Sequence, residues 1–306
     1  MTQTGTTGDK VFRSILIITA SIILVIMAMM IFMMVWNSLP TIREFGFGFL
    51  TGREWKPALS EFGALPFIYG TIVSSVVALI ISVPISLGIA IFLVEQAPKK
   101  IATPIAFMVE LLAAIPSVIY GLWGIFVLAP FVRDYLGVFL EKYLGWLPLF
   151  QGRLTGIGML TGGIILALMI TPIITAVVRD ILEVVPTAQR EAALALGATK
   201  WETTQIVLGN AASGIAGAVI LGLGRALGET MAVTMVIGNS PQISASLFEP
   251  AYTIASVLAA NFADATDEFY LSALIEMGLV LFLVTFVVNA LAKLLVMSVG
   301  SNIRHA

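Results

Sequence analysis

A single arginine, Arg225, lies within an otherwise apolar run that covers residues 222–233. An arginine in the middle of a membrane helix costs about 2.5–3.5 kcal/mol on insertion scales, so such a residue faces a partner or a water-filled path. Its guanidinium presents a planar fork of N–H donors that matches the oxygens of a phosphate group. Glu229 follows four residues later, which on a helix places both side chains on the same face.

Two interpretations of this pair stay open from the residues alone. In the structural interpretation, Arg225 and Glu229 neutralise each other at a helix interface, where Gly224 and Gly228 provide a small-residue packing face. In the functional interpretation, Arg225 supplies positive potential along an anion path, and Glu229 keeps the anion from binding too tightly. Since Arg225 is the only basic residue predicted to lie deep in the membrane, the functional interpretation depends on it.

A second polar feature is the stretch 184–205, which is helical in pattern but too polar to cross a membrane. Thr187 is suited to cap a short helix, and Gly197 is suited to end it. On periodicity alone, an amphipathic helix on the lipid surface is as good an interpretation as a docking element. The stretch is also similar to the EAA motif of ABC-importer permeases, whose short helix docks into a separate ATPase subunit. The residues that carry this similarity, and the docking role it implies, are Glu191, Ala192, Ala193 and Gly197.

The elements that hold these residues follow from a strongly apolar composition. Of the 306 residues, 59% are hydrophobic and 11% are charged, whereas soluble domains have about 45–50% and about 25%. Continuous apolar stretches, rather than alternating ones, predict membrane helices and argue against a β-barrel. The net charge of −2, without a basic run, gives no reason to expect a nucleic-acid partner. With no cysteine and one histidine, no metal site is predicted.

Six segments reach the length of about 20 residues that a helix needs to cross the hydrocarbon core. We therefore expect an all-α integral membrane protein in which residues 1–306 form one transmembrane domain. Pro116 is a candidate break in the third span, because proline removes a backbone donor and kinks a helix. The predicted spans are residues 14–36, 66–96, 101–130, 155–180, 206–237 and 270–298.

The distribution of basic residues predicts that both termini lie in the cytoplasm. Cytoplasmic segments carry an excess of Lys and Arg, and with the N-terminus inside most of the basic residues fall on the inner side. Residues 238–269 contain no Lys or Arg and are predicted to form an outer loop. Its acidic side chains are expected to be mainly solvated.

Two further acidic residues, Glu110 and Glu276, fall within predicted spans. Each can lie near the end of its span, where a carboxylate is paired or in contact with water. We expect structural pairing or solvation for both, and a ligand-binding role for neither.

Several segments together resemble the PstC-type permease subunits of phosphate ABC importers, within the MetI-like superfamily. They are RALGETMAV at 225–233, IPSVIYGLWG at 115–124, Gly238-Asn239 and Asn261-Phe262-Ala263, and the resemblance covers the chain from about Phe67 onward. It implies a permease fold of about six helices in the inner membrane of a prokaryote. It also implies that Arg225, Glu229 and Thr230 line the translocation path.

The resemblance further implies partner chains. These are a sister permease similar to PstA, a dimer of a cytoplasmic ATPase similar to PstB, and an extracytoplasmic phosphate-binding protein similar to PstS. The lipid bilayer surrounds the permease subunits. The chain contains no phosphate-binding loop of the form Gly-x-x-x-x-Gly-Lys-Ser/Thr, so ATP and Mg²⁺ are expected on the partner ATPase. We expect this chain to bind no cofactor and to have no catalytic residues of its own.

Three alternatives remain beside a phosphate permease. An ABC permease for another oxyanion, such as sulfate or molybdate, would share the EAA helix, and substrate competition would separate it. An ion-coupled secondary anion carrier would use Glu110, Glu229 or Glu276 as a proton relay and need no ATPase. An intramembrane enzyme is the least favoured alternative, because the sequence contains no metal-ligand cluster or nucleophile motif.

Overall fold

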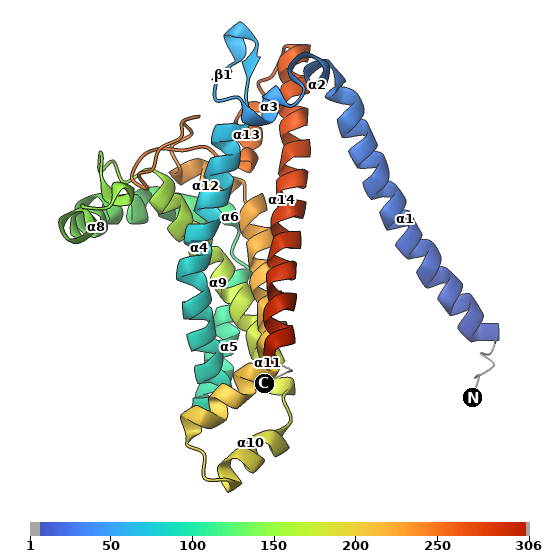
Figure 1. Ribbon diagram of the computed structural model, residues 1–306, viewed down its shortest axis with the longest axis vertical. Coiled ribbons are helices and arrows are strands. Elements are labelled where there is room, and N and C mark those ends of the chain that lie inside the picture. Colours follow the sequence, from blue (N-terminus) through green and yellow to red (C-terminus); the bar gives the residue numbers. More distant parts are fainter. Residues whose placement is uncertain (1–6, 304–306) are drawn as a thin grey trace.

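The computed structural model describes the backbone of residues 7–303 and the side chains of residues 8–296. Most of this part is helical (Figure 1). Six of its helices are long and apolar enough to cross a membrane. They are Gly8–Asn37, Leu65–Gln96, Ser117–Leu144, Met159–Val184, Lys200–Gly228 and Glu268–Val296.

Four of the predicted spans are confirmed as continuous helices. Residues 14–36 lie in α1 (Thr7–Asn37), and residues 270–298 lie in α14 (Glu268–Ile303). Residues 66–96 form α4 (Leu65–Ile91) together with a π-helical end, η2 (Phe92–Gln96). The predicted span 155–180 is α9 (Met159–Val184), displaced by four residues at each end. Hydropathy therefore located these helices to within about a turn at most ends.

The predicted third span, 101–130, is not a single helix, and the predicted break at Pro116 is confirmed. α5 (Lys99–Ala113) ends before Pro116, whose ψ of 139° is extended, and α6 (Ser117–Trp123) begins directly after it. Proline lacks the N–H that would continue the helix and disfavours helical geometry in the residue before it. The second helix continues without interruption through η3 (Gly124–Leu128), α7 (Ala129–Phe131), η4 (Val132–Leu136) and α8 (Gly137–Leu144).

The predicted fifth span, 206–237, is also broken. α11 (Lys200–Gly228) ends at Gly228, and α12 (Met231–Val236) follows after two non-helical residues. α11 begins six residues earlier than predicted because Thr199 and Glu202 form a capping box. In it, Glu202 Oε2 accepts from the Thr199 N–H at 2.7 Å, and Thr199 Oγ1 accepts from the Glu202 N–H at 3.3 Å.

The core lies between α4 and α9, which pack against each other along much of their length. Small residues allow this close approach: a methyl group at Gly163 would lie 2.5 Å from Val77 Cγ1. Ser86 Oγ adds a hydrogen bond of 3.1 Å to the carbonyl of Thr171. By contrast, α1 stands away from this body in Figure 1, and none of its span is buried within the chain.

A compact cap covers the end of the body beside α1's Asn37 end (Figure 1). It contains α2 (Leu39–Phe45), α3 (Gly48–Thr51), η1 (Pro57–Leu59) and a two-stranded antiparallel hairpin of β1 (Trp55–Lys56) and β2 (Glu61–Phe62). Aromatic rings hold it together: the Trp55 ring lies 5.0 Å from Phe62 and 4.9 Å from Phe67, centroid to centroid. We call this the hairpin end.

Residues 238–269, predicted to be an outer loop, also lie at the hairpin end, but much of the segment is packed rather than free. It contains α13 (Ile254–Asn261), whose first four residues are buried. The carbonyls of Leu247 and Glu249 accept from the first N–H groups of α9, Leu160 at 2.7 Å and Met159 at 3.1 Å. The loop thereby satisfies donors that a helix leaves unpaired at its start. Another short helix at this end, η5 (Pro148–Phe150), precedes it.

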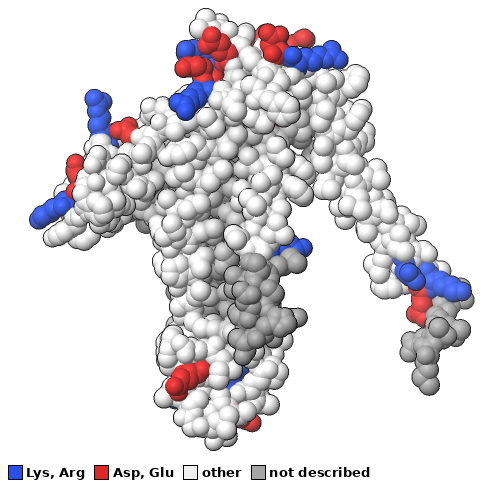
Figure 2. Space-filling view, viewed as in Figure 1, with Lys and Arg blue, Asp and Glu red and all other residues white. Residues whose placement is uncertain are grey.

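The opposite end of the body carries a short helix, α10 (Thr187–Ala195), which projects at the bottom of Figure 1. We call this the α10 end. On the face shown in Figure 2, charged side chains gather mostly toward the ends of the molecule, and the surface between them is nearly free of charge. This distribution is the one expected of a body that spans a lipid bilayer.

Candidate functional site

Arg225 lies in the last turn of α11, and its side chain is exposed at the surface of the chain. The predicted intrahelical pair with Glu229 is wrong, because α11 ends at Gly228 and Glu229 is extended, with φ −69° and ψ 128°. Within the part of the chain that the structure describes, Arg225 forms no ion pair. The guanidinium is therefore available to a group outside this chain.

The break that separates Arg225 from α12 interrupts the helical hydrogen bonds of the chain at Glu229. Glu229 and Thr230, both half-buried, occupy the break. The Thr230 carbonyl accepts from the N–H of Thr234 at 3.0 Å and from its hydroxyl at 2.7 Å. The N–H groups at the start of α12 have no helical carbonyl to bond. Broken helices of this kind are tolerated at membrane depth where they line a cavity or are buried in protein.

The two broken helices meet each other. α12 packs against α6 at Gly121, where an added methyl group would lie 2.5 Å from Met235 Sδ and 3.2 Å from Ala232 Cα. The α6 side of this contact also carries Tyr120. Tyr120 in turn bridges the break before α6, since its hydroxyl donates to the Leu112 carbonyl at 2.9 Å. At the break between α11 and α12, a guanidinium that is unpaired within the described chain can bind an oxyanion through paired N–H donors.

The second predicted site is α10, which carries Glu191, Ala192 and Ala193. Glu191 and Ala192 are exposed, whereas Ala193 is buried and fixes the helix to the body. Thr187 does not cap the helix as predicted: it is the first helical residue, and Pro186 precedes it as the N-cap without a side-chain bond. Gly197 ends the helix as predicted, with a left-handed φ of +87° that favours glycine.

Large apolar side chains surround α10 without a partner in the described chain. Leu196 is 90% exposed, and Val184, Leu194 and Trp201 are also more exposed than not. An apolar group of this kind at a projecting helix is typical of a protein contact surface. The last six residues of the predicted coupling segment 184–205 belong to α11, so the projecting unit is shorter than predicted.

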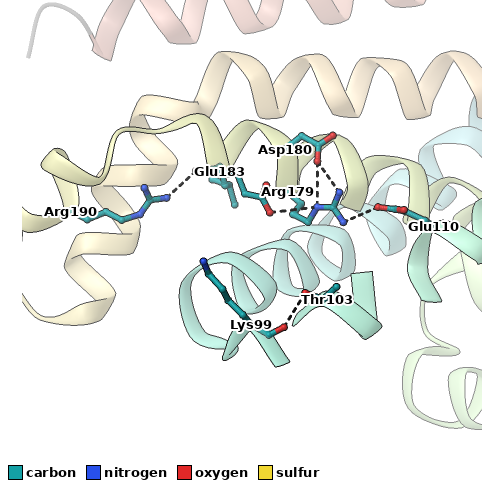
Figure 3. Close-up of polar contacts among 8 residues, drawn as sticks. Lys99, Thr103, Glu110, Arg179, Asp180, Glu183 and Arg190 are labelled. Atoms are coloured by element: carbon teal, nitrogen blue, oxygen red, sulfur yellow. Dashed lines mark hydrogen bonds and ion pairs between the residues drawn. The ribbon is translucent and has the colours of Figure 1, made fainter. Parts of the chain in front are cut away.

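The length of α5, the end of α9 and the π-helical turn η2 line an open cavity of about 620 Å³ with charged walls. Figure 3 shows Arg179 of α9 between Asp180 and Glu110. Its Nη1 lies 2.9 Å from Glu110 Oε1 of α5, and its Nη2 lies 3.0 Å from Asp180 Oδ1. The expected structural pairing of Glu110 is confirmed, and the carboxylates of Glu110 and Asp180 compensate the charge of Arg179.

For Glu276 the expectation of pairing or solvation holds for only part of the carboxyl group, which interacts with the side chain of Thr41. Its side chain is 7% exposed, and its Oε2 atom has no hydrogen-bond partner within the described chain. It lines a cavity of about 260 Å³ whose other walls, including Ile42, Phe47 and Leu279, are apolar. The Oε2 atom therefore carries a desolvation cost without a compensating bond within the described chain.

Sequence reasoning missed one polar cluster near α10. Arg190 is bonded to Glu95 of η2 with an Nη2–Oε1 distance of 2.8 Å. Glu95 was visible as a charge at the end of a predicted span and Arg190 as a charge in the segment 184–205, but their 95-residue separation gave no signal of contact. The structure thus adds a pair that joins α10 to the end of α4.

Comparison with known proteins agrees with this arrangement. Residues 82–300 match the model of a family described as "Binding-protein-dependent transport system inner membrane component". A solved chain of the MetNI methionine ABC transporter, in an inward-facing conformation, has the same fold, with a TM-score of 0.60 and 18% identity. That match covers 80% of this chain and 99% of the other. Fold and family match together define the class: a multi-pass membrane permease subunit of an ABC importer, which is not itself an enzyme.

Curated relatives narrow this class. A chain from Xylella fastidiosa (strain Temecula1 / ATCC 700964), named phosphate transport system permease protein PstC, is 46% identical over 95% of this chain and 91% of its own length. The protein of that name from Pasteurella multocida (strain Pm70) is 44% identical over 95% and 92%. A probable PstC from Methanocaldococcus jannaschii is 38% identical over 83% and 82%. The chain therefore belongs to the PstC family of phosphate transport system permease proteins.

Proposed function

We propose that this chain is the permease subunit of an ATP-driven importer of inorganic phosphate and forms half of its translocation path. The observation that carries the proposal is the unpaired guanidinium of Arg225, exposed at the break between α11 and α12. An importer of an oxyanion needs positive charge or N–H donors along its path, and Arg225 offers both. The PstC relatives support phosphate as the anion.

Glu229 and Thr230 belong to the same proposed path. Both lie in the break itself, where the backbone leaves helical geometry. The carboxylate of Glu229 opposes an anion and would lower its residence time, so that phosphate can leave the site as well as enter it. Thr230 offers a hydroxyl group that both donates and accepts hydrogen bonds.

The partners follow from the class of protein. We infer that α10 docks into a cytoplasmic ATPase similar to PstB, with ATP and Mg²⁺ bound on that partner. Glu191, Ala192 and Gly197 face the ATPase in this proposal, and the buried Ala193 couples α10 to the membrane body. A sister permease similar to PstA completes the path, and a phosphate-binding protein similar to PstS delivers phosphate at the hairpin end. This orientation puts the α10 end and both termini in the cytoplasm of a prokaryote, whose inner membrane holds the complex.

Transport then proceeds by alternating access. Closure of the ATPase dimer on ATP moves α10, and the broken helices α5–α6 and α11–α12 reorient toward the hairpin end to receive phosphate. Hydrolysis returns the path to the cytoplasmic side. The chain acts throughout as a gated conduit.

The test is uptake of labelled phosphate by the assembled importer, with ATP and with excess unlabelled sulfate or molybdate. Arg225→Gln should lower uptake by about tenfold or more, since hydrogen bonds to charged groups contribute about 1.5–3 kcal/mol each. Arg225→Lys should restore part of it, because the charge returns without the fork. Arg13→Gln is the matched control, since Arg13 is an exposed arginine of α1, far along the sequence from the break.

Other results of this uptake experiment would contradict the proposal in distinguishable ways. Uptake that sulfate or molybdate abolishes would assign the chain to another oxyanion. Uptake that continues without the ATPase would indicate an ion-coupled carrier. Native uptake by an assembled Arg225→Gln importer would refute the anion-path role of Arg225.

A further inference from the structure

Arg190, in the first turns of α10, is held by four hydrogen bonds. Its Nη1 donates to the carbonyl of Val185 at 2.6 Å, and its Nη2 donates to the carbonyl of Leu182 at 2.9 Å. Its Nε and Nη2 both reach Glu95 Oε1, at 3.1 and 2.8 Å. One guanidinium thus binds the carbonyl end of α9 and the carboxylate of η2, and Figure 3 shows it reaching toward the end of α9.

This contact is shielded from water. The side chains of Arg190 and Glu95 are 18% and 11% exposed, whereas the ion pairs at the hairpin end are about half exposed. A shielded pair with several bonds has a defined geometry, and loss of either partner leaves a charge uncompensated. The cationic group also lies at a helix C-terminus, where the helix dipole favours it.

Glu95 reaches Arg190 because the end of α4 is not an ordinary α-helix. Residues Phe92–Gln96 form a π-helical turn, which accommodates an extra residue and changes the direction of the side chains that follow. The chain then leaves the helix at Ala97, which is extended, with ψ 133°. Single π-helical turns occur often at functional sites, and here the turn holds the acidic partner of α10.

The other contacts of α10 are weaker. Gln189 Oε1 accepts from Asn210 Nδ2 of α11 at 2.7 Å, in a neutral and exposed hydrogen bond. Ala193 is the one residue of α10 that is buried. Within the described chain, Arg190 therefore provides the only charged contact between α10 and the membrane helices.

We propose that Arg190 and Glu95 form a clamp that makes α10, the end of α9 and the end of α4 move as one unit. This inference deepens the proposed function: if α10 docks on the ATPase, the clamp transmits its movement to the α4–α9 pair. The close packing of α4 on α9 then carries the movement along the membrane body. Arg190 and Glu95 are positioning residues, because neither lies near Arg225 in sequence or contacts it.

A distance measurement tests the clamp directly. The chain has no cysteine, so Ala188→Cys and Gln96→Cys, both at exposed positions, can carry a pair of spin labels in an importer whose other subunits lack reactive cysteines. The native chain should give one narrow distance distribution, and Arg190→Gln should broaden or shift it. Lys100→Gln removes a positive charge from an exposed residue at the same end and should leave it unchanged. A native distribution in Arg190→Gln would overturn the clamp.

A second measurement tests its role in coupling, as phosphate transported per ATP hydrolysed in proteoliposomes. Arg190→Gln should lower this ratio about fivefold or more, the low end of typical coupling between sites, while ATP hydrolysis continues. Glu95→Gln should act in the same direction, and the double variant should be no worse than Arg190→Gln alone, because both changes remove one contact. Arg190→Lys should recover part of the ratio.

Independent losses in the double variant, or a native ratio in Arg190→Gln, would contradict the coupling role. Failure of the proposed function is distinguishable from failure of the clamp. If the unmodified importer transports no phosphate, the proposed function fails, whereas the spin-label distances still decide whether Arg190 holds α10.

Discussion

Three arginines in or beside the membrane helices are accommodated in three different ways. Arg179 is paired with Glu110 across two helices, and Arg190 is bonded to one carboxylate and two carbonyls. Both are compensated within the chain and therefore hold helices together. Arg225 has no such compensation in the described chain and lies where two helices break. Because an uncompensated charge in a membrane protein needs a partner, Arg225 is the one suited to a transient ligand.

Glu276 provides a prediction at the same scale. Replacing it with methionine removes the unpaired Oε2 and fits the apolar walls of the neighbouring cavity. Thr41 loses its contact with the Glu276 carboxyl group but keeps its hydrogen bonds to the Ser38 carbonyl, at 3.1 Å, and to Ser272 Oγ, at 3.2 Å. A buried unsatisfied polar group costs about 1–3 kcal/mol, and each kcal/mol shifts the melting temperature by about 2–4 °C in a chain of this order of size.

We therefore expect Glu276→Met to raise the melting temperature of the detergent-purified permease by several degrees. Glu44→Met, at an exposed glutamate of α2, is the control and should change it little. A lower melting temperature in Glu276→Met would mean that the carboxyl group is paired in the purified protein.

At the scale of elements, the sequence predicted the continuous helices better than the broken ones. Long apolar runs define α4, α9 and α14 because hydropathy depends only on local composition. The break before α6 has a local cause as well, Pro116, and was foreseen. The break at Glu229 was not, because the residues around it are compatible with a helix and tertiary packing against α6 decides their conformation.

The same distinction applies to the site. Arg225 could be singled out from its charge in an apolar run, and Gly197 from its place after a short helix. The pairing of Arg190 with Glu95 depends on two helix ends that are distant in sequence, so no local pattern contains it. The unpaired Oε2 of Glu276 likewise depends on the cap that covers it.

Glycines of α4 give a prediction about how elements approach each other. A methyl group at Gly70 would collide with the carbonyl oxygen of Tyr252, so the segment after residue 238 can pack on α4 only because that position is glycine. Gly70→Ala should therefore destabilise the permease by about 1–3 kcal/mol or more, the usual cost of overpacking. The measurement is thermal unfolding of the purified protein.

Gly88, on the same helix, is the matched control. A methyl group there meets no atom within 4 Å, and alanine favours a helix by about 0.8–1.0 kcal/mol over glycine. Gly88→Ala should be neutral or stabilising. Equal effects of the two substitutions would show that helix propensity, and not the contact with Tyr252, decides the outcome.

At the scale of the whole molecule, charge and hydropathy separate two ends from a membrane-spanning body (Figure 2). The hairpin end is a packed cap of aromatic rings and a buried loop, whereas the α10 end is a projecting helix with exposed apolar side chains. A rigid cap is suited to receive a soluble partner without rearranging. A helix attached through one shielded ion pair is suited to move with a partner.

This division leads to a prediction of orientation. The positive-inside rule places the α10 end, with Lys99, Lys100 and Arg190, in the cytoplasm. Since the chain has no cysteine, Ala58→Cys in η1 and Gln96→Cys in η2 report on the two ends separately. In intact cells, a membrane-impermeant maleimide should label position 58 only, and position 96 should react after the membrane is opened. The reverse pattern would place α10 outside the cell, where no ATPase could reach it, and would exclude ATP-driven import through this helix.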